Sequence, residues 1–118
     1  MEGDKAALRD GSVFEYCKLN DMVIQAWSVL QFGYFKGNFV GNEKFQQLNQ
    51  VLNRLALKYG VSPSAIAIAW VLRYPAKMQA VVGTTNPKHL IEASQASHIN
   101  LTRKEWYEIY LAAGNDLP

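Results

Sequence analysis

Two long segments of the chain have the apolar spacing of helices. In residues 45–59 apolar side chains recur every three or four positions, the period of an amphipathic helix. Asn42 is placed to cap this segment, and Gly60 follows it where a left-handed C-terminal residue is expected. Residues 65–72 are apolar nearly all round, so this second helix should be largely buried.

Four further polar residues are placed as N-terminal caps of helices. Two of them are followed directly by proline, which needs no amide donor at the first helical position. A third opens a Thr-Arg-Lys-Glu capping box, in which the glutamate side chain returns to the threonine amide. The expected caps are Ser12, Ser62, Asn86 and Thr102.

Two short apolar runs have the character of strands. Residues 22–27 are β-branched and mostly apolar, which fits a strand buried on both faces, and residues 79–82 form a second run closed by Gly83. Strand, helices, strand and helix alternate along the chain, which predicts parallel pairing through crossovers rather than hairpins. The expected fold class is α/β, in a single unit over residues 1–118 without an internal boundary.

Residues 31–41 contain three glycines among aromatic side chains and follow neither a period of 2 nor one of 3.6, which predicts a loop. Two strands cannot form a sheet that buries itself. The strands that would complete the sheet are therefore expected to come from residues outside this chain.

Composition narrows the class of protein. With 49% hydrophobic and 19% charged residues over 118 positions, the chain is an ordinary globular sequence of one domain. Its net charge of +2 gives no footprint for nucleic acid or an anionic membrane. The longest apolar run is far shorter than the roughly 20 residues of a membrane span, and residues 1–10 lack the apolar stretch of a secretory signal, so a cytoplasmic location is expected. Cys17 is the only cysteine, and no Cys/His spacing indicates a metal.

Three motifs, taken in order, resemble the NAD(P)H-dependent aldo-keto reductases. They are Ala-Trp-Ser-Val-Leu at residues 26–30, Ala-Trp-Val-Leu-Arg at residues 69–73, and Gly-Thr-Thr-Asn-Pro-Lys-His-Leu-Ile-Glu at residues 83–92. The resemblance runs from about Ser12 to the C-terminus. It implies the C-terminal portion of a (β/α)8 TIM barrel, with strands seven and eight and their helices. Barrels of this kind bind phosphate at the loops after those two strands.

The resemblance assigns the first motif to the nicotinamide end of the cofactor. Trp27 stands where the family usually has tyrosine and would stack on the nicotinamide ring, which needs a flat apolar wall. Ser28 and Leu30 would hold the pyrophosphate, largely through backbone groups. Two alternatives stay open: Trp27 as a core residue at a strand end, and Leu30 as a packing residue.

The last motif corresponds to the adenosine end. Thr84 and Thr85 would contact the ribose or its 2′-phosphate, with simple capping by their hydroxyls as the alternative. Gly83 and His89 stand where the family commonly has lysine and arginine, which removes two permanent charges, so NADP(H) is expected and NAD(H) remains possible. Glu92 would contact the adenine amino group.

The resemblance places the catalytic acid and its helpers elsewhere. The family's proton donor is a tyrosine, tuned by lysine, aspartate and histidine on earlier strands, and no segment here resembles them. The tyrosines of this chain are interpreted as packing residues of helices or of the aromatic loop, and no catalytic residue is expected. The chain is thus interpreted as a fragment, the cofactor-binding part of an oxidoreductase that reduces small carbonyl compounds.

Two other functions remain open at this point: a nucleotide-binding module without catalysis, and a helical interaction domain. In the leading interpretation the open sheet edges require a partner. That partner is either the missing N-terminal half of the barrel or a second copy of the chain.

Overall fold

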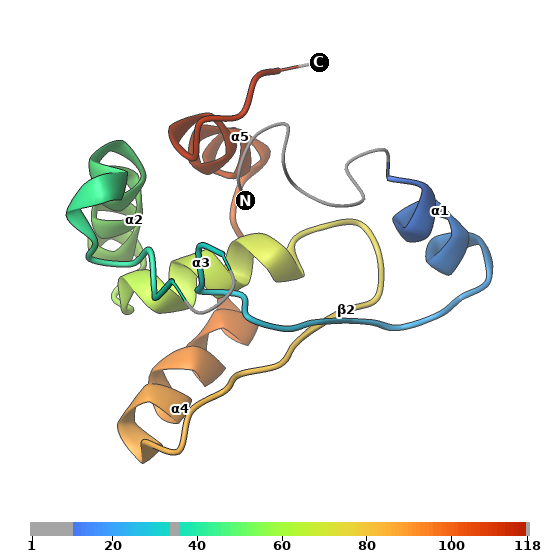
Figure 1. The fold of residues 1–118 in the computed structure, drawn as a ribbon, viewed down its shortest axis with the longest axis horizontal. Coiled ribbons are helices and arrows are strands. Elements are labelled where there is room, and N and C mark those ends of the chain that lie inside the picture. The colour runs from blue at the N-terminus through green and yellow to red at the C-terminus, as the bar shows by residue number, and fades with distance from the viewer. Residues whose placement is uncertain (1–10, 34–35, 118) are drawn as a thin grey trace.

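The computed structural model describes residues 11–33 and 36–117 of the chain. The chain forms several helices and one short pair of strands, as Figure 1 shows. In chain order the elements are α1 (Ser12–Leu19), β1 (Ile24–Ala26), the 3₁₀ helix η1 (Glu43–Phe45), α2 (Gln46–Tyr59), α3 (Pro63–Leu72), β2 (Met78–Ala80), α4 (Pro87–Ser94), the 3₁₀ helix η2 (Gln95–His98) and α5 (Arg103–Ala112).

The two described strands pair in parallel, which confirms the prediction from βα alternation. Ile24 lies opposite Met78 and Ala26 opposite Ala80, and the amide of Val81 extends the ladder by donating to the carbonyl of Ala26 at 2.8 Å. Both strands differ from the predicted ranges 22–27 and 79–82. Each is three residues long, because a strand extends only as far as it finds backbone partners.

The sheet is covered on one face only, so the expectation of a strand buried on both faces is wrong for this chain. Gln25 and Gln79 lie opposite each other on the open face, both exposed, and their side-chain amides share a hydrogen bond of 3.1 Å. On the other face Ala80 packs against the core, and β2 contacts α3. No element among the described residues covers the glutamine face.

The core is built around α3. Its five residues from Ala65 to Ala69 are buried, including Ile66 and Ile68, as the apolar composition of this segment predicts. Leu52 and Leu55 of α2 complete the most deeply buried group. Helix α2 packs mainly against α3 and α5 rather than against the sheet (Figure 1).

Three of the five predicted caps are confirmed. Ser62 accepts from the amide of Ala65 at 3.2 Å, Asn86 accepts from Lys88, and Thr102 forms both halves of its capping box. These bonds satisfy amides at helix starts that have no partner within the helix.

The other cap predictions need correction. Helix α1 begins at Ser12 itself, after Gly11 with φ 72°, so Ser12 is the first helical residue rather than the cap. Asn42 caps η1 by accepting from Lys44, and α2 begins only at Gln46. At the far end of α2, Gly60 adopts the expected left-handed conformation with φ 67°.

Helix α5 is attached to α3 through a pair of tryptophans. The indole nitrogen of Trp70 donates to the carbonyl of Trp106 at 3.0 Å, and that of Trp106 donates to the carbonyl of Trp70 at 3.1 Å. The two rings stack with centroids 4.7 Å apart and planes 10° from parallel. Both polar and apolar parts of each indole are therefore used in one contact.

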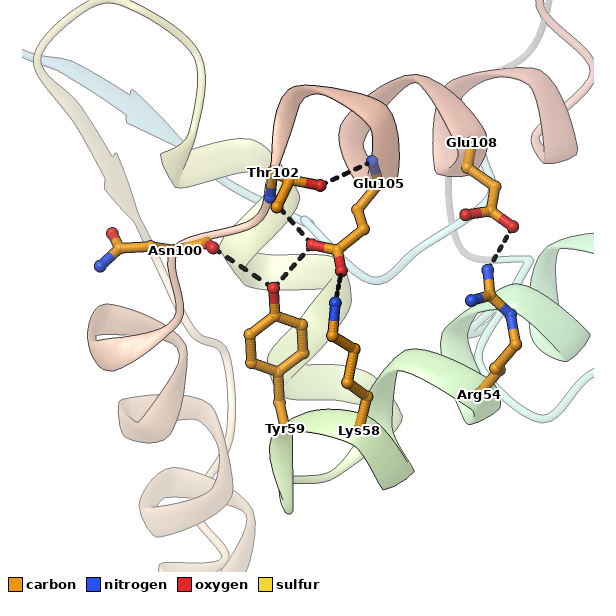
Figure 2. Close-up of polar contacts among 7 residues, drawn as sticks. All are labelled: Arg54, Lys58, Tyr59, Asn100, Thr102, Glu105 and Glu108. Atoms are coloured by element: carbon orange, nitrogen blue, oxygen red, sulfur yellow. Dashed lines mark hydrogen bonds and ion pairs between the residues drawn. The ribbon is translucent and has the colours of Figure 1, made fainter.

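A buried carboxylate joins α5 to the end of α2 (Figure 2). Glu105 is only 6% exposed; one of its oxygens binds the Lys58 ammonium, and the other accepts from the Tyr59 hydroxyl at 2.6 Å and the Thr102 amide at 2.8 Å. Burial raises the pKa of Glu105, but the hydrogen bonds from Lys58, Tyr59 and Thr102 outweigh it and lower the pKa to about 2. The bond to Glu105, followed by burial, raises the pKa of Tyr59 to about 12.

No single helix in residues 11–33 or 36–117 is long and apolar enough to cross a membrane. Only the pair Glu43–Tyr59 and Pro63–Leu72 reaches that length and composition together, and it is bent by 94°.

We predict that Glu105 makes the stability of the fold depend on pH. Because its pKa falls from 4.5 to about 2 on folding, its contribution is full above about pH 5 and is lost as the pH drops toward 2. Glu105→Gln should lower the free energy of unfolding at neutral pH by about 1–3 kcal/mol and flatten this acid dependence. Urea denaturation between acid and neutral pH measures both.

The matched control is Glu108→Gln on the same helix. Glu108 pairs with Arg54, but these side chains are 38% and 56% exposed, so the loss should stay under about 1 kcal/mol. Equal losses for the two variants would contradict the special role of Glu105.

Candidate cofactor site

The two loops singled out in the sequence lie at the same end of the sheet. Residues 27–30 follow β1 directly, and residues 81–86 connect β2 to α4. In a parallel pair the carboxyl ends of both strands meet at one edge, and the bond between Val81 and Ala26 holds the two loop starts together. Pairing over a long sequence separation thus forms one candidate site from two distant motifs.

Trp27 is the first residue after β1 and is 69% exposed. Its ring is available to a ligand, so the alternative of Trp27 as a core residue is wrong for this chain. Ser28 follows with φ 55°, a left-handed conformation that costs a residue other than glycine about 1–3 kcal/mol. The Ser28 carbonyl accepts from the amide of Gln31 at 2.9 Å, which closes a tight turn.

Leu30 faces the core while its backbone joins the next segment. The side chain is half-buried and packs against the core cluster, which confirms a packing role for it. Its carbonyl accepts from the amide of Phe39 at 3.1 Å, beside an antiparallel bridge between Gln31 and Asn38. The predicted loop at residues 31–41 is therefore a loop, with residues 34–35 outside the described part.

The second loop has an open, polar surface. Gly83 is exposed, and a Cβ built on it would meet nothing within 4 Å. The Thr84 hydroxyl accepts from the amide of Asn86 at 3.1 Å, so the capping alternative describes one of its contacts, while Thr85 is exposed. Since Asn86 in turn caps α4, this loop leads directly into a helix N-terminus, where the helix dipole favours an anion.

Two further candidates lie on one face of α4. His89 is exposed and Glu92 is half-buried, three positions apart, so they are neighbours on the helix surface. Six of the eight predicted site residues thus lie in the loops after the two strands, and His89 and Glu92 lie on the helix that follows the second loop.

The described hollows lie elsewhere. One of about 350 Å³ sits at the amino ends of the strands, where Met22 precedes β1 and Lys77 precedes β2; Cys17, half-buried on α1, lines it. Another of similar volume lies between η1 and the end of α5. Neither of these two hollows is lined by a candidate residue.

The titratable groups do not suggest a second centre. The described residues contain no cluster of three His, Cys, Asp or Glu side chains that could hold a metal. The pKa values of Glu105 and Tyr59 are clearly shifted, but these two side chains bond to each other between α5 and α2 and lie outside the candidate loops. Tyr74 lies in the turn after α3 rather than in a helix or the aromatic loop, and Tyr34 falls outside the described residues. The remaining tyrosines lie in α1, α2 and α5, as expected.

One residue near the site was missed. Asn49 is a buried polar residue on the apolar face of α2, and its side-chain amide bonds to the backbone of the segment after the first loop. The sequence does give one sign of it: Asn49, directly after Leu48, is a polar residue that interrupts the apolar face of the predicted helix.

The chain is similar to several known proteins. The profile of the Aldo/keto reductase family matches residues 7–112. Over 94 residues the chain is 37% identical to a 6-dehydroglucose reductase of Agrobacterium fabrum (78% of this chain) and 28% identical to one of Novosphingobium aromaticivorans (79%). A crystal structure of a thermostable aldo-keto reductase with the inhibitor epalrestat superposes with a TM-score of 0.67 and 26% identity, over 88% of this chain and 34% of that one.

The chain spans about 30% of the length of the two reductases it matches. The resemblance inferred from its motifs is confirmed, as is an α/β fold similar to part of a solved aldo-keto reductase. Because the family profile covers nearly the whole sequence, the chain belongs to the aldo/keto reductase family.

Proposed function

We propose that this chain is the cofactor-holding, C-terminal portion of an NAD(P)H-dependent aldo-keto reductase barrel, with β1 and β2 as its seventh and eighth strands. The observation that carries the proposal is the parallel pairing of β1 with β2, which brings the loops at residues 27–30 and 81–86 to one end of the sheet. Phosphate sites of such barrels are built from the two corresponding loops.

The residues present fit a nicotinamide dinucleotide. The exposed ring of Trp27 offers a flat wall on which a nicotinamide ring stacks. The turn at Ser28 and Leu30 presents backbone groups to the pyrophosphate. When bound, the cofactor supplies the hydride; the part of this chain is to bind it and fix which face of its ring is open.

The adenosine half fits the second loop and α4. Thr84, Thr85 and the start of the helix would hold the ribose or its 2′-phosphate, and Glu92 the adenine amino group. The absence of a side chain at Gly83 leaves room for close approach. His89, exposed on α4, is the proposed contact of a 2′-phosphate, so NADP(H) is the proposed cofactor, with NAD(H) as the alternative.

The proton donor and most of the carbonyl pocket are proposed to lie outside this chain. The described tyrosines are not in the candidate loops, and the glutamine face of the sheet has no cover among the described residues. The rest of the barrel, or a second copy, would pair the open strand edges. The proposed substrates are small carbonyl compounds, including oxidised sugars, because two of the relatives are 6-dehydroglucose reductases.

We predict that Trp27 reports cofactor binding. Titration with NADPH should quench its fluorescence, and Trp27→Ala should weaken binding roughly tenfold by removing the stacking contact, with Trp27→Phe in between. Trp70→Phe, a change in the stacked pair near α5, is the control and should leave affinity unchanged. Equal affinity in the wild type and Trp27→Ala would remove Trp27 from the site.

His89→Arg tests the adenosine end. A permanent charge with bidentate donors should tighten NADPH binding by several-fold to roughly tenfold and leave NADH affinity unchanged, because only NADPH carries the 2′-phosphate. His98→Arg adds the same charge at an exposed position on η2 and serves as control. A gain for NADH as large as that for NADPH would contradict the assignment.

The pure chain should bind cofactor without reducing carbonyl compounds. Without a positioned proton donor, the reaction loses a factor on the order of a hundred or more, along with the substrate pocket. Absorbance of NADPH with a small aldehyde measures this. Turnover by the chain alone, abolished by changing one of its own tyrosines, would show that the catalytic acid is present here.

A further inference from the structure

Asn49 is a buried polar residue whose side-chain hydrogen bonds all go to backbone groups of residues that precede α2. Its side chain lies on the apolar face of α2 and the residue is 8% exposed. The side-chain oxygen Oδ1 accepts from an amide, and Nδ2 donates to three carbonyls. These partners are Gly41 N at 2.7 Å, Phe39 O at 2.9 Å, Asn42 O at 3.2 Å and Phe45 O at 3.0 Å.

Helix packing alone does not require asparagine here. The neighbouring positions of this face, Leu48 and Leu52, are buried leucines, and an apolar side chain would avoid the cost of burying an amide. Asparagine also favours helix formation less than leucine does. What the amide adds is attachment of the backbone of residues 39–45, which lies outside α2.

The attached segment is bonded directly to the candidate site. Asn49 holds the carbonyl of Phe39, and the amide of the same Phe39 donates to the carbonyl of Leu30 at 3.1 Å. Gly41, with φ 77°, turns its amide toward Asn49 in a conformation that other residues rarely adopt. A continuous path of hydrogen bonds therefore runs from α2 to the turn after β1.

We propose that Asn49 is a positioning residue of the cofactor site: it holds residues 39–45 against the turn at Ser28 and Leu30, and thereby fixes the backbone groups that meet the pyrophosphate. This inference rests on the proposed function for its ligand. The attachment itself is independent of any cofactor, and the two parts are tested separately.

The first test needs no cofactor and compares Asn49→Ala with Asn53→Ala. Asn53 is one helical turn away on α2 and is exposed, so its variant matches the chemistry of the change without the contacts. In Asn49→Ala the Gly41 amide should exchange with solvent roughly tenfold faster or more, and trypsin should cut sooner after Lys36 and Lys44. The Asn53 variant should behave as wild type. Unchanged exchange and cleavage in Asn49→Ala would overturn the attachment.

The second test measures cofactor release. In Asn49→Ala the dissociation rate of NADPH should rise several-fold, while the near-ultraviolet circular dichroism of the Trp70 and Trp106 pair stays that of wild type. A loosened segment with unchanged release would overturn the positioning role alone. Failure of the wild-type chain to bind NADPH would overturn the proposed function, and the positioning role with it.

A measurement on the wild type covers the case in which Asn49→Ala does not fold. The Nδ2 hydrogens of Asn49, bound to three carbonyls, should exchange with solvent at least about tenfold more slowly than those of exposed Asn53 in the same sample. Slow exchange supports the attachment, and equal rates for the two side chains would overturn it.

Discussion

The structure depends on one constraint, the need to cover helix α3. Its residues from Ala65 to Ala69 are apolar on every side, so a single neighbour cannot remove them from water. Part of this surface is covered by each of four elements: β2, α2, α4 and η2. Helix α5 contacts α3 through the tryptophan pair. The arrangement of these elements follows from that requirement, since each of them buries part of its surface against α3.

Parallel pairing converts this packing into a candidate site. Strands β1 and β2 come from opposite sides of α3 in the sequence, yet their carboxyl ends meet, so the tight turn at Ser28 lies beside the loop at Gly83. The same pairing leaves Gln25 and Gln79 on an open face.

Two buried polar residues add the specificity that the apolar core lacks. Glu105 connects α5 with Lys58 and Tyr59 at the end of α2, and Asn49 connects the start of α2 with the segment after the first loop. In both cases burial is tolerated because the polar atoms of the side chain have partners. The C-terminal end of α2 thereby holds α5, and its N-terminal end holds the segment at residues 39–45. Helix α2, which is part of the core, is thus bonded to the segment beside the candidate site.

The sequence by itself determined the local structure. The caps at Ser62, Asn86 and Thr102 and the helix faces could be predicted because each depends on residues within four positions along the chain. The motifs also indicated the family and placed the candidate residues after two strands. Only the tertiary structure decided which groups meet across the chain: Trp70 with Trp106, 36 residues apart, and Lys58 with Glu105, 47 apart. No local pattern encodes such pairs, because they form only when separate elements have docked.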